Sequence, residues 1–320
     1  MASPSLPAAA RDLPAWRLAP LPADRSLETA QAFCRFIAKA HYENFSVASR
    51  LVPRRLRQDF ATVYAYARWS DDLADEAAGP DEAARALADW RRQVDACFAG
   101  QPEHPIMVAL ADTVGRTGLT IEPFGDLLDA FEQDQWKNHF ATRVELLDYC
   151  RRSANPVGRI VLGLEGCRDP ELVELSDSIC TGLQLVNFWQ DLKRDRLAGR
   201  VYLPADDMRR HGVDEAMLDL ATAPQPLRSL VAEEVAWARE CFDRGAPLAV
   251  RGPRALRPAI GMFLGGGRAI ASAIERHGYD TLARRPVVGK ATKLALAARA
   301  WLGLQAAGLG FDGLSWGGAR

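Results

Sequence analysis

Several features that identify common protein classes are scarce in this chain of 320 residues. Its six cysteines are scattered and form no Cys-x-x-Cys pair, which argues against a disulfide framework or a zinc site and favours reduced thiols. The net charge of −1 gives no electrostatic basis for binding nucleic acid. No window reaches the roughly 18 uninterrupted apolar residues that a membrane span needs, so we expect a cytoplasmic protein without a transmembrane anchor.

Strand-like runs of Val, Ile and Thr are also missing, and almost every segment has helical periodicity. No repeat of fixed period emerges. We therefore expect an all-α fold, with one helical domain over 26–310 around a central apolar cavity and flexible ends at 1–25 and 311–320. The predicted helices cover 26–42, 56–77, 81–98, 105–117, 122–140, 144–164 with a break near Asn155-Pro156, 170–196, 205–211, 226–243, 255–277 and 290–309.

The C-terminal part of the chain has two interpretations. The stretch from Leu294 to Leu309 is rich in Ala and Leu and carries Trp301, which is compatible with peripheral membrane contact. A last helix packed on the body of the protein accounts for the same composition.

A first acidic motif lies in the segment Arg68-Trp69-Ser70-Asp71-Asp72-Leu73-Ala74-Asp75-Glu76. On a helix, Asp71 and Asp75 stack on one face, which also carries Phe60 and Tyr64. If that face turns inward, its carboxylates require a cation, because unpaired buried carboxylates are costly. A solvated acidic helix end before Gly79 explains this motif equally well on its own.

A second polar stripe favours the inward, cation-binding interpretation of the first motif over a solvated helix end. Gln184, Asn187, Asp191 and Asp195 are spaced three, four and four residues apart, and apolar residues fill most of the remaining circumference of the helix. Because a helix that is apolar nearly all round is buried, this stripe is expected to face something polar inside the protein. Two inward acidic stripes predict a shared pocket for divalent cations, and open all-oxygen ligand sets suit Mg²⁺ with a bound diphosphate. Ca²⁺ is the alternative, but no helix-loop-helix calcium loop is present.

With both motifs in place, residues 35 to 290 resemble the squalene and phytoene synthases, which join prenyl diphosphates head to head. The resemblance implies an isoprenoid synthase fold with a Mg²⁺-bound diphosphate at the mouth of an apolar cavity. The matching pieces, in order, are Tyr64-x-x-x-Arg68-x-x-Asp71-Asp72-x-x-Asp75, Asp126-x-x-Asp129, Tyr149-Cys150, Gln184-x-x-Asn187-x-x-x-Asp191-x-x-x-Asp195 and Arg200-x-Tyr202-Leu203-Pro204.

Within that family the chain looks most like the bacterial hydroxysqualene synthases of hopanoid biosynthesis. Glu43 and Gln190 stand where the other members usually carry Lys and Arg, and 149–158 departs from their usual sequence. The replacements remove two cations that could hold a second diphosphate. The resemblance therefore implies conversion of presqualene diphosphate, which carries one diphosphate, into hydroxysqualene.

The site residues follow from the stripes and from the resemblance. Arg68 would grip the departing diphosphate or pair with Asp72, Tyr64 would stabilise a carbocation or be a core aromatic, and Arg200 would clamp the diphosphate or be a solvated loop residue. Glu43, Arg151 and Asn155 form a candidate cluster that orders the water added to the cation. The predicted sets are Arg68, Tyr64, Asn187 and Arg151 for catalysis, Asp71, Asp75, Asp191 and Asp195 for Mg²⁺, and His41, Phe45, Asp72, Gln184, Asn155 and Arg200 for the prenyl diphosphate substrate.

Two alternatives stay open at this level. A complete squalene or phytoene synthase would condense two prenyl diphosphates, and a non-catalytic isoprenoid-binding protein would keep the fold without the chemistry. The Gly265-Gly266-Gly267 run follows no strand, so the sequence gives no nicotinamide-binding motif of the usual type.

Overall fold

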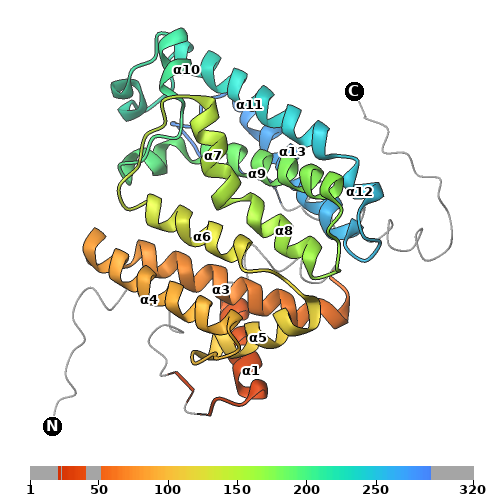
Figure 1. The fold of residues 1–320 in the computed structure, drawn as a ribbon. Coiled ribbons are helices and arrows are strands. Elements are labelled where there is room, and N and C mark those ends of the chain that lie inside the picture. The colour runs from red at the N-terminus through yellow and green to blue at the C-terminus, as the bar shows by residue number, and fades with distance from the viewer. Residues whose placement is uncertain (1–20, 23, 41–51, 290–320) are drawn as a thin grey trace. The chain divides into compact units, whose positions relative to one another are not determined.

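The structure is a computed structural model that describes residues 21–22, 24–40 and 52–289 (Figure 1). Over these ranges the regular secondary structure is helical, apart from an isolated bridge between His139 and Val201. The all-α fold class is therefore confirmed. Among the described helices, none is both long and apolar enough to cross a membrane. The predicted substrate residues His41 and Phe45, together with Glu43, lie outside the described ranges, as do 1–20 and the expected helix over 290–309.

The chain divides into two compact units, each described here by itself. The first unit holds the described residues of Met1–Ser46 and Arg55–Trp136, and the second those of Val47–Arg54 and Lys137–Arg320. The prediction of one domain around a central cavity stays a prediction.

The first unit packs α1 and α5 against α3, and α4 and α6 against one another and against α3. The core of this unit contains buried polar groups that form hydrogen bonds. The buried Tyr66 hydroxyl donates to the Phe124 carbonyl at 2.8 Å, and the Trp90 indole donates to the Ser70 hydroxyl at 2.9 Å. These bonds satisfy buried donors and hold α3 in one rotation about its axis. The helices of the unit are α1 (Leu27–Ala40), α3 (Arg57–Asp75), α4 (Pro80–Phe98), α5 (Pro105–Thr117) and α6 (Glu122–Gln133), and the short turn η2 (Arg54–Leu56) directly precedes α3.

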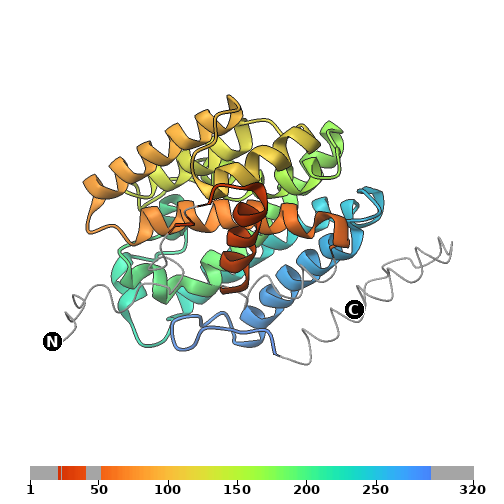
Figure 2. The same ribbon diagram turned by 90° about the horizontal axis from the view of Figure 1, so that it is seen from below.

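The second unit is built around α9, a helix of 28 residues that contacts α7, α8, α11, α12 and α13 (Figures 1 and 2). Its buried residues lie on most sides, as expected for a central helix. The elements of the unit are α7 (Arg143–Ser153), α8 (Asn155–Gly163), α9 (Pro170–Leu197), α10 (Ala205–Arg210), η3 (Glu215–Asp219), α11 (Gln225–Gly245), α12 (Leu248–Arg251) and α13 (Arg257–Arg276).

Glycines let three of these helices approach closely. A Cβ atom at Gly182 of α9 would lie 2.8 Å from the Phe242 ring of α11, and one at Gly267 of α13 would lie 2.3 Å from the same ring. Real Cβ contacts are not that short, so Phe242 fits between α9 and α13 only because both positions lack a side chain.

The predicted helix ranges agree with the structure to within about two residues at most ends, with two differences. The helix expected over 122–140 ends at Gln133, since 138–141 runs extended beside 199–206. The expected break near Asn155 separates α7 from α8, and Pro156 lies in the first turn of α8. The short helix α12, between Pro247 and Gly252, was not predicted.

Candidate functional site

The first acidic motif occupies the last two turns of α3. Tyr64 and Arg68 are half-buried on the same side of the helix, Asp71 is partly exposed, and Asp75 is exposed. The buried side of α3 is a different one, marked by Thr62, Tyr66 and Ser70. The predicted catalytic face is therefore the side of α3 that its own unit leaves accessible, and its carboxylates are more accessible than the sequence led us to expect.

Arg68 binds both neighbouring carboxylates of this motif. Its Nη1 donates to Asp71 at 3.0 Å and its Nη2 donates to Asp72. The Asp72 side chain is only 1% exposed, and burial raises the pKa of its carboxyl group to about 6 despite the opposing effect of Arg68. The pairing of Arg68 with Asp72 that the sequence offered as an alternative is thus present. It leaves Nη1 of the same guanidinium on the accessible side, beside Asp71.

The polar stripe of α9 is also accessible. Asn187 is exposed, while Gln184, Asp191 and Asp195 are half-buried, and the other residues of α9 from 181 to 192 are almost all buried. The predicted contrast between an apolar circumference and a polar stripe is confirmed. Oxygen donors one turn apart on a rigid helix suit a divalent cation.

Arg285 is the residue of this site that sequence reasoning missed. The chain after α13, in the darkest blue of Figure 2, folds back onto α9 and places the Arg285 guanidinium on Asp191, with Nε at 2.5 Å and Nη2 at 2.8 Å from the two carboxylate oxygens. Gln190 accepts a further bond from Arg285 at 3.1 Å and donates to the Pro286 carbonyl at 2.5 Å. Such a two-point contact fixes the arginine fork in the plane of the carboxylate.

Asp195 lies one turn beyond Asp191. Burial, followed by repulsion from Asp191, raises the pKa of Asp195 to about 7, while Arg200, Arg194 and Arg285 oppose the shift. Two carboxylates that repel one another in a partly buried place favour a bound cation. The Arg200 backbone N–H donates to the Asp195 carbonyl at 2.8 Å, so the loop that leaves α9 starts directly at the acidic stripe.

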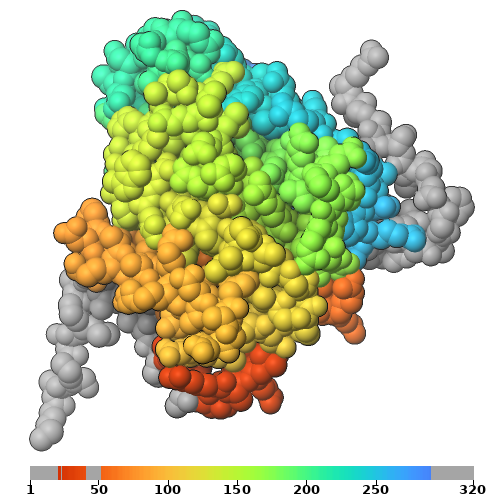
Figure 3. Space-filling model, viewed as in Figure 1, coloured from red at the N-terminus to blue at the C-terminus, as the bar shows by residue number. Residues whose placement is uncertain are grey.

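Two further predicted residues, Arg151 and Asn155, lie on α7 and α8 of the second unit. Asn155 is buried and accepts a hydrogen bond from Thr181 at 3.0 Å, which joins α8 to α9. Figure 3 shows the surface of α7 in yellow-green, and Arg151 of this helix forms an exposed ion pair with Asp148 at 3.2 Å. Asn155 thus forms a bond that joins two helices and Arg151 forms a surface ion pair, and their role in ordering a water stays a prediction.

A divalent metal ion is implied by both motifs, and the donor set is compatible with one. Within the part of the chain that the structure describes, no group of three or more His, Cys, Asp or Glu side chains is arranged to hold a metal ion. The two units each offer paired oxygen donors instead, from Asp71 and Asp75 on α3 and from Asp191 and Asp195 on α9. Mg²⁺ binds readily to one or two carboxylates and completes its shell with water and substrate phosphate, which such pairs allow.

The chain resembles solved and curated proteins over most of its length. Its similarity to the crystal structure of squalene synthase HpnC from Alicyclobacillus acidocaldarius has a TM-score of 0.76 at 41% identity, covering 79% of this chain and 95% of that one. A dehydrosqualene synthase in complex with a ligand gives a TM-score of 0.79 at 25% identity, covering 88% and 98%. A phytoene synthase from Arthrospira platensis is 31% identical over 284 residues, 83% of this chain and 90% of that protein.

These structures and the helical architecture define the class: the chain has the all-α fold of the isoprenoid synthases. Its family follows from the sequence itself. Residues 38–292 match the squalene/phytoene synthase family model, and the chain belongs to that family.

Proposed function

We propose that this protein converts presqualene diphosphate and water into hydroxysqualene, with release of diphosphate and with Mg²⁺ as the required metal. The observation that carries the proposal is the environment of Gln190. This neutral side chain is buried, and both ends of its amide are used, one on Arg285 and one on the Pro286 carbonyl. The resemblance to the family implies that related enzymes usually carry an arginine at this position, and here the residue is uncharged.

The number of positively charged side chains at the site connects this observation with the number of diphosphates bound. Binding two diphosphates in one site requires more cationic donors than binding one, because each brings several negative charges. Gln190 adds no charge, and the Arg285 guanidinium is paired with Asp191. A substrate with a single diphosphate is the one that this arrangement serves best.

The residues then have distinct tasks. The pair Asp71 and Asp75 on α3 and the pair Asp191 and Asp195 on α9 would each hold Mg²⁺, which supplies Lewis-acid stabilisation of charge on the leaving diphosphate. Arg68 donates to Asp72 through Nη2 and to Asp71 through Nη1. Nη1 would donate to the diphosphate as the carbon–oxygen bond breaks.

Tyr64 serves the organic part of the substrate. Burial raises the pKa of its phenol, so the group stays protonated at neutral pH. Its ring would stabilise the carbocation, and its hydroxyl would remain a hydrogen-bond donor. A water held near the cation then adds to it, and the proton released passes to solvent.

The decisive experiment incubates the purified chain with presqualene diphosphate and Mg²⁺, without a nicotinamide, and identifies the product by mass. We expect a C30 alcohol and one diphosphate released for each alcohol formed. Omission of Mg²⁺ is the matched control and should stop turnover. A product formed from farnesyl diphosphate alone would contradict the one-diphosphate proposal.

A second candidate is condensation of two prenyl diphosphates by a complete squalene or phytoene synthase. It is supported by the relatives, which include curated phytoene synthases about 30% identical to this chain. Geranylgeranyl diphosphate in the same assay tests it, since a C40 hydrocarbon would assign the condensation to this protein. A non-catalytic isoprenoid-binding role predicts binding without diphosphate release in every arm.

A further inference from the structure

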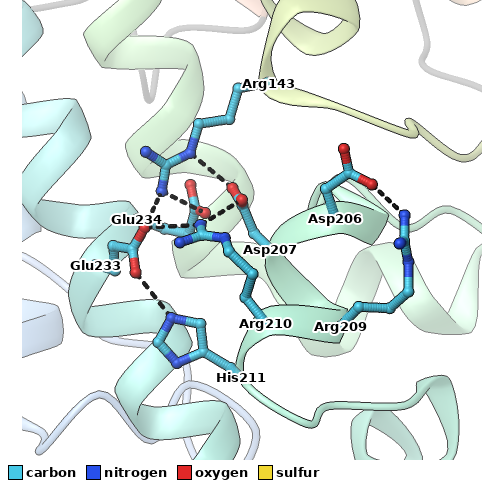
Figure 4. A network of polar contacts seen from close by, with 8 residues as sticks. All are labelled: Arg143, Asp206, Asp207, Arg209, Arg210, His211, Glu233 and Glu234. Carbon is cyan, nitrogen blue, oxygen red and sulfur yellow. Dashed lines mark hydrogen bonds and ion pairs between the residues drawn. The ribbon is translucent and has the colours of Figure 1, made fainter.

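A cluster of charged side chains, in which Asp207 and Glu234 are buried, joins α7, α10 and α11 of the second unit (Figure 4). Arg143 at the start of α7 donates to Asp207 of α10 at 2.6 Å, to Glu233 at 2.7 Å and to Glu234 at 3.1 Å, the last two on α11. Arg210 also donates to Asp207 and, at 2.9 Å, to Glu233.

Glu234 differs from the other acids of this cluster. It is completely buried, whereas Glu233 is 35% exposed. Burial, together with a hydrogen bond to Asp207, raises the pKa of Glu234 to about 8, while hydrogen bonds from Arg210 and His211 lower that of Glu233 to about 2. For Asp207, burial acts to raise the pKa, but bonds from Glu234, Arg210 and Arg143 outweigh it and lower the pKa.

Glu234 Oε1 accepts from Arg143, whereas its Oε2 is buried and receives no bond from a described donor, so Oε2 is the oxygen that a proton shared with Asp207 would occupy. Two guanidinium groups then face two carboxylates, Asp207 and Glu233, and Glu234 enters as a neutral donor. Ionisation of Glu234 would add a third negative charge beside Asp207 in a place closed to water, which is costly.

Asp207 is connected through the backbone to the loop between α9 and α10. The Asp206 and Ala205 N–H groups donate to the carbonyls of Ala141 and Phe140, and the Val201 N–H donates to Asn138, at 2.8 to 3.0 Å. The Tyr202 ring stacks on Phe188 of α9 at 3.8 Å between centroids.

The loop begins at Gly199 and Arg200. The Asn138 amide donates to the Gly199 carbonyl at 2.8 Å, and Arg200 follows directly, bonded through its N–H to Asp195. A displacement of α10 would therefore be passed to the residue that adjoins the acidic stripe.

We propose that Glu234 is a positioning residue: as an uncharged acid it donates to Asp207, docks α10 on α11, and so holds the Gly199–Pro204 loop and Arg200 in place beside Asp195. The catalytic part of this inference rests on the proposed function, because it takes Arg200 to act on the substrate. The docking part does not depend on it.

Other charged groups on α11 do not interfere with Glu234. Arg239 pairs with Glu275 of α13, and Asp243 pairs with Arg268, both farther along α11. Where α9 and α13 pack most closely on α11, Gly182 and Gly267 meet the Phe242 ring and Ile179 meets Gly245, and all of these residues are uncharged. The groups that face Glu234 are thus Arg143 from α7 and Asp207 from α10, with Arg210, His211 and Glu233 completing the cluster.

The test compares the wild-type chain with Glu234→Gln, whose amide stays neutral at every pH and can still donate to Asp207. Trypsin cleavage of the Arg200–Val201 bond, quantified by mass spectrometry, reports release of the loop. The wild-type rate divided by the Glu234→Gln rate at the same pH should rise roughly three- to tenfold between pH 7 and pH 9, since the acid ionises only in the wild type. Dividing the rates cancels the pH dependence of trypsin itself.

Glu233→Gln is the matched control, because its acid is already ionised across this range. It should retain the wild-type rise. Glu234→Leu, which fills the space without donating, should be cleaved faster than Glu234→Gln at every pH. A rate ratio that does not change with pH, or a rise abolished equally by Glu233→Gln, would overturn the positioning role.

Turnover of presqualene diphosphate provides the catalytic arm. At pH values above the pKa of Glu234, we expect kcat/KM of the wild type to fall about tenfold per pH unit relative to kcat/KM of Glu234→Gln. Equal pH profiles combined with a pH-dependent cleavage ratio would refute the catalytic part alone. If no variant turns over this substrate, the proposed function fails, while the cleavage ratio still decides the docking role.

Discussion

The two acidic motifs neutralise their charge in different ways. On α3, Arg68 belongs to the same helix as Asp71 and Asp72 and lies three and four residues away. On α9, the cation hydrogen-bonded to Asp191 is Arg285, which is 94 residues distant in sequence, while Arg194 of the same helix lies farther off at 3.7 Å. The first arrangement follows from helix geometry alone, whereas the second exists only when the chain after α13 folds back.

The burial of the carboxylates also differs. Asp72 is almost completely buried and depends on Arg68, while the Asp191 side chain is 21% exposed and can exchange its arginine for another cation. The comparison teaches that the α3 motif combines a structural ion pair with a binding group, and that the α9 motif is better suited to exchange of ligands. The following predictions test that difference.

The largest effect is expected for Asp191→Asn. Loss of one metal-binding carboxylate should lower turnover of the prenyl diphosphate by roughly a thousandfold, because an amide holds Mg²⁺ poorly. Thermal unfolding should change little, since Asp191 is not a core residue. Asp177→Asn on the same helix removes a different ion pair, to Arg159, and should keep full turnover. Retained activity in Asp191→Asn would remove this residue from the site.

Arg68→Gln should produce the largest loss of stability. It leaves the Asp72 carboxylate buried without its cation, which costs about 3 kcal/mol in the free energy of unfolding. Chemical denaturation at pH 7 measures this loss. The double variant Arg68→Gln with Asp72→Asn should recover most of it, and a double variant no more stable than the single one would refute the buried-pair explanation.

The raised pKa of Asp72 predicts a pH dependence of smaller size. A carboxyl group whose pKa is higher in the folded state than in the unfolded state stabilises the fold most below its unfolded value. That stability is lost as the pH rises to about 6. Between pH 4 and pH 6 the wild type should lose on the order of 2 kcal/mol relative to Asp72→Asn. Parallel stability curves for the two proteins would contradict it.

Arg285→Gln should have the smallest effect on stability, less than about 1 kcal/mol, because its pair with Asp191 is partly exposed. Without the competing guanidinium, Mg²⁺ should bind severalfold more tightly. A thermal-shift titration with Mg²⁺ measures this, because the free energy of unfolding rises with the affinity of the bound ion. Arg284→Gln is the matched control and should leave the titration unchanged. A weaker Mg²⁺ response in Arg285→Gln would show that the arginine does not compete with the metal.

Much of this picture could be predicted from local patterns. The helix ranges and the polar stripe of α9 follow from periodicities of three to four residues, and the i and i+4 spacing of Arg68 and Asp72 predicts their contact. The end of α6 at Gln133 was missed, since pairing of 138–141 with 199–206 overrides the helical pattern there.

Long-range contacts lay beyond the sequence patterns. Arg285 lies in an irregular segment, and no periodicity links it to Asp191. The Glu234 cluster did leave a signal: within the predicted helix 226–243, an acid occupies the apolar face that also carries Leu227, Leu230 and Val231. A charged residue on such a face predicts a buried partner, although it does not identify Arg143 or Asp207.

The ring of Phe242 has a consequence for how enzymes of this kind can change. It is wedged between Gly182 and Gly267, two positions that can accept no methyl group without displacing a neighbour. The direction of the α9 carboxylates is thereby set from the opposite flank of their helix. Substitutions at Gly182 or Gly267 would therefore shift the carboxylates that we propose to bind the metal ion without changing those residues themselves.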